Sequence, residues 1–324
     1  MSVPSKKIAA TRPCPISGTN EAIVISSKDR HGKPLRNIIS SDSGLIYVDP
    51  VPFENTEEFY KTDYRKSYKG VHQPKAKHVY RAGNVALQRL LRLSKLLPKG
   101  ARCLDAGSSS GEFVYLLNSK GFDAQGVEAN LPYADYSQAE LSISVTRSAF
   151  SEFNTEKKFD IITMFHVLEH LENPVRDLSH LRNFLKTGGK LIIEVPNILY
   201  PNMAFCHKWH PGHLFSFTND TLALLIEKAG FRTLSSSSIG DGGNLWGVFE
   251  KPEDSQSQPT TKSRMPSVNA VMGDLLKQRT GYYFRLSNFL KLFRKIPVMI
   301  SEKAKSRSLS GKEILDRLYE DFSY

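Results

Sequence analysis

The stretch Arg102-Cys103-Leu104-Asp105-Ala106-Gly107-Ser108-Ser109-Ser110-Gly111 decides the fold of this chain. A short apolar run leads into a loop of small residues, and an amphipathic segment over 112–117 follows. This order predicts a strand, a tight turn and a helix, because small residues let the backbone turn sharply and let a ligand approach it closely. The free N–H groups at the start of such a helix favour a polar or anionic ligand group.

A second strand is predicted over 121–128, and it ends in the acidic side chain of Glu128. In nucleotide-binding α/β folds, a carboxylate at this place binds the ribose hydroxyls of the ligand. The loop does not match the dinucleotide fingerprint G-x-G-x-x-G, because Ser109 stands where a glycine is needed. No Gly-Lys-Ser/Thr follows either, so it is not a phosphate loop. The pattern predicts a nucleoside ligand held between the loop and Glu128.

Strands and helices alternate along the rest of this region. A helix over 78–97, with apolar residues every three to four positions, precedes the first strand. Further strands are predicted over 142–146, 159–165 and 190–195, helices over 174–185 and 219–229, and a terminal antiparallel pair over 231–234 and 245–250. We therefore predict an α/β fold with a Rossmann-like, seven-stranded, mostly parallel sheet covered by helices on both faces.

The Asp-x-Gly-x-x-x-Gly loop with its later acid resembles the class I S-adenosylmethionine-dependent methyltransferases of the type 11/23 group. The segments 159–170 and 185–193 carry the same resemblance, which covers roughly residues 75–250. It implies S-adenosylmethionine as cofactor, with the loop under its methionine part and Glu128 on its ribose. The alternative is a Rossmann-like domain that binds another nucleoside. The cofactor-binding residues that the resemblance implies are Asp105, Gly107, Ser109, Gly111, Glu128, Ala149, Phe150 and Phe165.

The first 53 residues are predicted to form a small β-rich module. In its turns, Cys14-Pro15-Ile16-Ser17-Gly18 and Ser40-Ser41-Asp42-Ser43-Gly44 resemble the paired cysteine turns of a four-cysteine zinc ribbon found in many methyltransferases of this type. Only Cys14 is kept, and serines take the other three places. A structural zinc site needs four thiolate or imidazole ligands, so we predict the shape of the ribbon without its metal.

The remaining organisation is read from composition. We predict a connector and helix over 54–100, the cofactor-binding domain over 101–250, a polar linker over 251–270 and a basic helical tail over 271–324. Much of the net charge of +11 lies in this tail. Its segment 282–295 has apolar residues at helical spacing with basic ones between them, which fits contact with an anionic membrane surface or packing on the domain or on a second subunit. No nucleic-acid recognition motif accompanies the charge.

The composition is typical of a soluble protein, with 40% hydrophobic and 24% charged residues. There is no apolar run long enough for a membrane helix and no secretion signal at the N-terminus. Three scattered cysteines do not make a disulfide framework. We therefore expect a cytoplasmic protein. Whether its basic tail makes peripheral contact with the inner membrane surface stays open. An oligomeric state stays open as well.

Polar residues follow the carboxyl ends of several predicted strands, where open α/β sheets bind their ligands. We expect the first loop, the segment 165–170 and the segment 206–213 to converge there. Histidine is suited to accept a proton near neutral pH, and methyl transfer to a hydroxyl or a carbon needs such a base. The predicted catalytic residues are His213, His210 and His170.

A second reading of this region concerns metals. His166-x-x-Glu169-His170 spells the inverted zinc-peptidase motif, whose side chains would share one face of a helix. The Glu-His pair also resembles small-RNA and quinone-precursor methyltransferases, which bind a divalent metal with it. No metal is predicted here, but a set of His166, Glu169, His170 and His213 stays open.

Together these features predict S-adenosylmethionine-dependent methyl transfer to a small-molecule or glycan acceptor. A sugar, nucleotide-sugar or lipid-linked glycan is favoured, because the run 213–218 resembles a stretch of sugar C-methyltransferases. The alternatives are methylation of RNA or of a quinone precursor, or a cofactor-binding scaffold protein that has lost catalysis.

Overall fold

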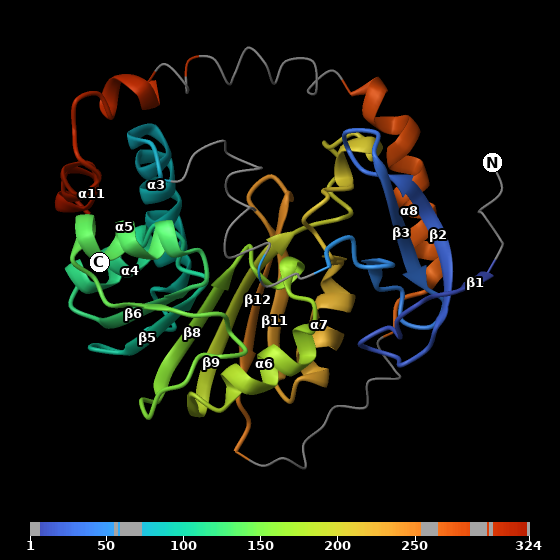
Figure 1. Ribbon diagram of the computed structural model, residues 1–324, viewed down its shortest axis with the longest axis horizontal. Coiled ribbons are helices and arrows are strands. Elements are labelled where there is room, and N and C mark those ends of the chain that lie inside the picture. The colour runs from blue at the N-terminus through green and yellow to red at the C-terminus, as the bar shows by residue number, and fades with distance from the viewer. Residues whose placement is uncertain are drawn as a thin grey trace. The chain divides into compact units, whose positions relative to one another are not determined.

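A mixed sheet of seven strands carries the fold (Figure 1). Strands β5, β6, β7 and β8 pair in parallel, whereas β9, β12 and β11 pair antiparallel. The prediction of a Rossmann-like, mostly parallel seven-stranded sheet is confirmed. In sheet order the strands are β11 (Arg232–Ile239), β12 (Asn244–Glu250), β9 (Leu185–Pro196), β8 (Phe159–Phe165), β5 (Arg102–Ala106), β6 (Asp123–Glu128) and β7 (Val145–Arg147).

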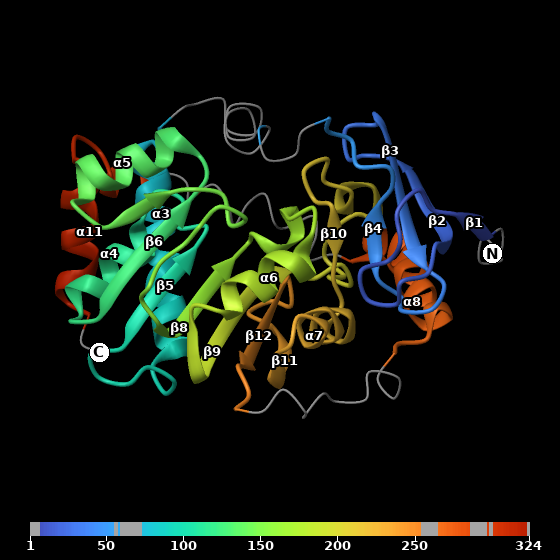
Figure 2. The same ribbon diagram turned by 60° about the horizontal axis from the view of Figure 1, so that its bottom comes forward.

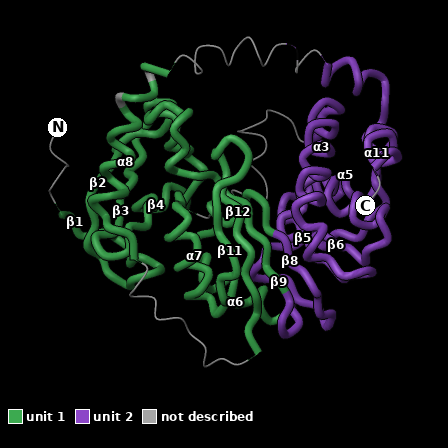
Figure 3. Tube along the Cα trace, turned by 180° about the vertical axis from the view of Figure 1, so that it is seen from behind, with its two compact units in different colours: residues 1–54, 164–183, 190–289 green, residues 55–163, 184–189, 290–324 purple. Residues whose placement is uncertain are grey.

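The computed structural model describes residues 7–54, 58, 73–253, 265–285, 297 and 301–322. The chain divides into two compact units (Figure 3). Unit 1 comprises 1–54, 164–183 and 190–289, and unit 2 comprises 55–163, 184–189 and 290–324. Most of the predicted connector between 55 and 72, and most of the amphipathic segment 282–295, lie outside the described residues. Within the described ranges, no helix is both long enough and apolar enough to cross a bilayer.

Unit 2 holds the helices that pack around β5, β6 and β7. They are α3 (Ala76–Leu93), α4 (Glu112–Ser119), α5 (Leu131–Leu141) and α11 (Gly311–Glu320). Helix α11 lies against α3, α4 and α5. Its approach to α3 is close at Gly83, where an added Cβ would lie 2.8 Å from the Leu315 side chain. The part of the basic tail that forms α11 therefore packs on the cofactor-binding domain, and Leu315 and Tyr319 are buried there.

Unit 1 holds a second, five-stranded sheet and the helices α6 (Pro174–Arg182), α7 (Asn219–Lys228) and α8 (Val268–Gly281). Helix α8 lies along this sheet in both views (Figures 1 and 2), and its residues Val271, Met272 and Leu275 are buried against Ile39 and Ile46. The start of the predicted tail is thus part of the N-terminal core. In order, the strands of this sheet are β1 (Lys7–Ala9), β2 (Glu21–Lys28), β3 (Pro34–Ser40), β4 (Ile46–Val48) and β10 (Phe215–Ser216).

Several predicted boundaries were wrong. The helix predicted over 174–185 ends at Arg182, and β9 begins at Leu185 and continues through Gly188, which has a φ of +71°. A glycine pair after an amphipathic run resembles a helix end, but here it lies inside a long strand. The strand predicted over 142–146 is β7, displaced to Val145–Arg147 because Ser142 takes a left-handed conformation at the end of α5.

The four positions that resemble a zinc ribbon lie together in unit 1. Cys14 Sγ is 3.1 Å from Ser43 Oγ, and Ser17 Oγ is 3.4 Å from Ser40 Oγ. Each turn is closed by a glycine with positive φ, since Gly18 donates its N–H to Cys14 O and Gly44 donates to Ser40 O. The paired turns therefore meet through a contact between a thiol and a hydroxyl group and through a contact between two hydroxyl groups.

This arrangement predicts that metal binding can be restored. The triple variant Ser17→Cys, Ser40→Cys, Ser43→Cys places four thiols where the two turns meet, and we expect it to bind one Co²⁺ or Zn²⁺ with tetrahedral thiolate geometry. Cobalt absorption spectroscopy of purified protein checks this, with the single variant Ser41→Cys on the same turn as control. A triple variant with no more cobalt absorption than the control would contradict the prediction.

Candidate cofactor and histidine sites

The loop after β5 is pressed against the end of β6. Gly107 and Ser108 both donate their N–H groups to the carbonyl of Val127, at 2.8 and 3.0 Å. An added Cβ at Gly126 would lie 2.4 Å from Ser108 Oγ, so only glycine allows this approach. Ser109 takes a left-handed φ of +51°, a conformation that costs energy for a residue other than glycine.

Glu128 closes the loop, as the strand–loop–strand pattern predicts. Its side chain is almost fully buried. Oε2 accepts a hydrogen bond from Ser109 N at 2.7 Å, and Oε1 accepts one from Asn130 N at 2.8 Å. Because a carboxylate offers about four lone-pair sites, each oxygen keeps room for one ribose hydroxyl. The predicted cofactor residues Gly107, Ser109, Gly111 and Glu128 are thus brought together.

Asp105 lies under the loop. It is 4% exposed and accepts a hydrogen bond from Thr163 Oγ1 on β8 at 2.7 Å. Burial raises its pKa to about 6, because the charged form is poorly solvated there, and the Thr163 bond opposes this only in part.

The remaining predicted cofactor residues are placed differently. Ala149 is buried just after Ser148, whose N–H donates to Glu128 O at 3.2 Å, so the segment holding Phe150 adjoins the predicted ribose acid. Phe165 belongs to unit 1, where its ring stacks on Trp246 with centroids 5.6 Å apart.

The segments 165–170 and 206–213 converge within unit 1, as predicted. His170 donates from Nδ1 to the carbonyl of Gly212 at 2.7 Å, and its ring lies 4.9 Å from that of His213. Nε2 of His170 lies 3.9 Å from Glu169 Oε1. The first loop belongs to unit 2, so its predicted convergence with these segments stays a prediction.

Glu169 is a buried acid that faces the ring of His166 without accepting a hydrogen bond from it. It is 1% exposed, and within the described part of the chain neither carboxylate oxygen accepts a hydrogen bond. His166 Nδ1 is 3.4 Å from Oε1. A carboxylate removed from water in this way is costly unless a cation or a proton compensates it.

His210 and His213 are held as neutral rings. Burial lowers the pKa of His210 to about 3, and burial together with His170 and His210 lowers that of His213 well below 6.5. Nδ1 of His210 already accepts a hydrogen bond from Gly212 N at 2.9 Å, and its ring stacks on His213. Such rings are weak bases, but a neutral imidazole is the form that binds metals.

His166 is not on a helix with Glu169 and His170, so these side chains do not have the helical arrangement of the inverted zinc-peptidase motif. It has a φ of +57° and precedes a 3₁₀ turn, η2 (Leu168–His170). Its ring lies between Glu169 and Glu194, 3.5 Å from the latter. Although burial opposes the charge, these two carboxylates raise the pKa of His166 to about 9.

Glu194 and Asn244 are site residues that the sequence analysis missed. Asn244 Nδ2 donates to Glu194 Oε1 at 2.6 Å and lies 3.4 Å from His166 Nε2. The signal for Glu194 was an acid inside the apolar run 191–195, since buried strands rarely carry an unpaired charge. Asn244 gave no local signal, because only the pairing of β12 with β9 brings it here.

One group of described residues has the geometry of a metal site. A carboxylate oxygen of Glu169 and one ring nitrogen each of His170 and His213 lie within 4.8 Å of one another. The carbonyl of Gly212 fixes the His170 tautomer from behind, as is usual for metal-binding histidines. A buried carboxylate and two imidazoles at these distances, one of them the neutral His213, fit a divalent cation.

Comparisons with known proteins agree with this fold. The family described as "Methyltransferase domain" matches residues 77–236. A Ubiquinone biosynthesis O-methyltransferase of Cereibacter sphaeroides is 30% identical over 156 residues, 43% of this chain and 63% of that protein. One of Rickettsia typhi is 29% identical over 99 residues, 29% of this chain and 40% of that protein. The chain thus spans less than two thirds of the length of these relatives.

Among solved structures, the N-methyltransferase NodS from Bradyrhizobium japonicum in complex with S-adenosyl-L-homocysteine is 18% identical. The match covers 62% of this chain and all of NodS, with a TM-score of 0.45. The family match agrees with the loop, the acid and the sheet, and the chain belongs to the class I S-adenosylmethionine-dependent methyltransferases. Its cofactor is S-adenosylmethionine.

The raised pKa of Asp105 predicts a stability that falls with pH. The folded state holds the proton up to about pH 6, whereas the unfolded chain releases it near 3.8, so stability is lost as the pH rises from 4 to 6. Two pKa units correspond to about 3 kcal/mol. Asp105→Asn keeps the oxygen that faces Thr163 and removes this loss. Its free energy of unfolding in urea should gain on the wild type by about that amount between pH 4 and 7. A difference independent of pH would contradict this.

The loop geometry predicts a strong effect at Gly111 and a weak one at Gly121. Both have a φ above +80°, so alanine costs about 1 kcal/mol of strain at either position. At Gly111 an added Cβ would also lie 2.4 Å from Ile143 Cδ1, whereas at Gly121 nothing lies within 4 Å. We expect Gly111→Ala to lower the free energy of unfolding by about 3 kcal/mol and to abolish cofactor binding in calorimetry. The control Gly121→Ala should keep wild-type affinity, and equal affinities in both variants would refute the role of the loop.

Proposed function

We propose that this protein transfers the methyl group of S-adenosylmethionine to a phenolic hydroxyl of an aromatic acceptor, of the kind from which quinones are made. The observation that carries the proposal is the geometry of three side chains: an oxygen of the buried Glu169 carboxylate and one ring nitrogen each of His170 and His213 lie within 4.8 Å of one another. A cation-binding group of this composition serves a hydroxyl acceptor that must lose its proton.

The cofactor is assigned to the loop after β5. Gly111 N donates to Ser108 O just before α4, and Glu128 is held by two backbone donors, Ser109 N and Asn130 N. These residues bind and orient the nucleoside, and S-adenosylmethionine brings its own electrophilic methyl group. The protein has to position the acceptor oxygen and remove its proton.

The residues that would hold a divalent cation are Glu169, His170 and His213. Such an ion lowers the pKa of a hydroxyl bound to it. His170 is already oriented by Gly212 O, and His213 is neutral, so His213 has no proton to lose before it binds an ion. We therefore revise the expectation of a site without metal, and we place His213 as a ligand rather than as the base.

A phenol fits this environment better than a sugar hydroxyl. The phenol of tyrosine has a pKa of about 10, and an alcohol gives up its proton far less readily. His210, the remaining histidine on this segment, is a weak base, which suits the more acidic acceptor. The curated relatives named Ubiquinone biosynthesis O-methyltransferase support the same class, whereas the sugar acceptor rests on the run 213–218 alone.

Radiolabelled methyl transfer tests the proposal. Purified protein is supplied with methyl-labelled S-adenosylmethionine, Mg²⁺ or Mn²⁺, and a panel of dihydroxybenzoates with and without a polyprenyl chain, nucleotide sugars and bulk RNA. We expect label in the phenolic compounds. Label only in sugars or in RNA would overturn the acceptor class. Cofactor binding in calorimetry without transfer to the panel or to any cell-extract fraction would favour the scaffold reading.

A metal-binding measurement tests the cation site apart from turnover. Glu169→Gln removes the carboxylate charge, and we expect it to weaken Mn²⁺ or Co²⁺ binding in calorimetry by at least about tenfold. His213→Ala should do the same. The controls Glu172→Gln and His207→Ala change exposed side chains nearby in sequence and should bind metal as the wild type does. Equal metal binding by Glu169→Gln and wild type would contradict the site.

A further inference from the structure

The N-terminal module is hydrogen-bonded to the segment that carries the histidines. Strand β4 pairs with β10, so that Tyr47 lies opposite Phe215. Val48 N donates to Leu214 O at 2.9 Å, and Leu214 N donates in turn to Glu169 O at 2.8 Å. Two consecutive backbone hydrogen bonds thus link β4 to Leu214, the residue after His213, and Leu214 to Glu169.

The other end of the histidine segment is held by the same module. Arg30 N donates to the carbonyl of Trp209 at 2.8 Å, and Trp209 is buried. The turn that presents Arg30 is fixed by Asp29, whose Oδ1 accepts from His31 N and Lys33 N, both at 2.8 Å. His210 and His213 therefore lie on a segment anchored at both ends by the first 54 residues.

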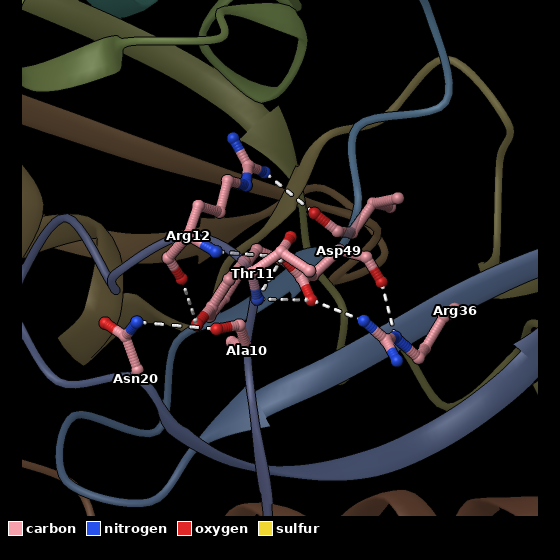
Figure 4. Close-up of polar contacts among 8 residues, drawn as sticks. Ala10, Thr11, Arg12, Asn20, Arg36 and Asp49 are labelled. Carbon is pink, nitrogen blue, oxygen red and sulfur yellow. Dashed lines mark hydrogen bonds and ion pairs between the residues drawn. The ribbon is translucent and has the colours of Figure 1, made fainter.

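One fully buried carboxylate organises the contact. Asp49, which follows β4, has no exposed surface. It accepts hydrogen bonds from Thr11 N at 3.0 Å, Arg12 N at 3.2 Å and Arg36 Nη2 at 2.7 Å, and from the Thr11 hydroxyl (Figure 4). Arg36 Nε also donates to the Asp49 carbonyl at 2.6 Å. Unlike Glu169, Asp49 accepts hydrogen bonds on both of its carboxylate oxygens.

Arg12 connects Asp49 to the segments that hold the histidines. Its Nη2 donates to Val48 O at 2.9 Å, and its Nη1 lies 3.5 Å from Glu172 O, two residues after His170. The guanidinium also lies over the Phe215 ring, 5.0 Å from its centroid. Arg12 thus touches β4, β10 and the segment after η2 at once.

We propose that the N-terminal module is a structural part of the acceptor site, and that Asp49 is a positioning residue that sets His170 and His213 against Glu169 through Arg12 and β4. Strand β10 has only two residues, too few to hold its place without a partner strand. The inference about turnover rests on the proposed function. The inference about order in the histidine segment stands without it.

Asp49→Asn is the main test, and Glu21→Gln is its matched control, because Glu21 lies in the same module but pairs with Lys7 on the exposed surface. Hydrogen exchange by mass spectrometry compares the segment 209–217 with the loop 101–111 in the full chain. We expect Asp49→Asn to speed exchange in 209–217 by about tenfold or more, as the loss of buried charged hydrogen bonds implies. Exchange in 101–111 and cofactor affinity should stay within about twofold of wild type. The control should match the wild type throughout.

Metal binding and turnover give the second readout. Asp49→Asn should weaken Mn²⁺ binding and lower kcat by about tenfold, with cofactor affinity unchanged. Unchanged exchange in 209–217, or exchange that rises equally in both segments, would overturn the inference. If the wild type transfers no methyl group to any acceptor, the proposed function fails and the exchange and metal results still decide this inference. Should Asp49→Asn not fold, Arg12→Met keeps the Asp49 carboxylate, removes the guanidinium contacts with Val48 O, Glu172 O and the Phe215 ring, and carries the same expectations.

Discussion

The constraint on which the fold depends is the close approach of the loop after β5 to the end of β6. N–H groups of the loop donate to the carbonyl of Val127 and to the carboxylate of Glu128, and the side chain of Ser108 takes the space that any Cβ on Gly126 would need. Two adjacent parallel strands, a left-handed turn at Gly111 and the start of α4 follow from this contact. The place where a nucleoside binds is therefore formed by backbone packing before any ligand arrives.

The two acids of the candidate sites show opposite ways of keeping a charge inside a protein. Glu128 is met by backbone donors, whereas Glu169 faces imidazoles and has no hydrogen bond among the described residues. Glu194 lies between these cases, because Asn244 and His166 both approach it. Asp49 accepts hydrogen bonds from four donor groups, whereas Glu169 accepts none among the described residues.

The sequence predicted what is local. The loop and Glu128 are encoded within a few residues, and the structure has them where expected. It did not predict β10 or the role of Asn244, because a two-residue strand and a single amide gain meaning only from distant partners. Gly188 misled because the same residue ends helices and lies in irregular strands. The turns at Cys14 and Ser43 lie together because glycines with positive φ and backbone hydrogen bonds shape each turn, without four cysteines.

Helix α11 has a consequence for the order in which the chain assembles. Tyr319 donates its hydroxyl to the carbonyl of Glu112, 207 residues earlier and the first residue of α4, and Lys120 near the end of α4 donates to the carbonyl of Tyr319. Closing so long a loop is slow, since its entropy is lost before the contact forms. During synthesis, one face of helix α4 therefore stays uncovered until the last part of unit 2 has left the ribosome.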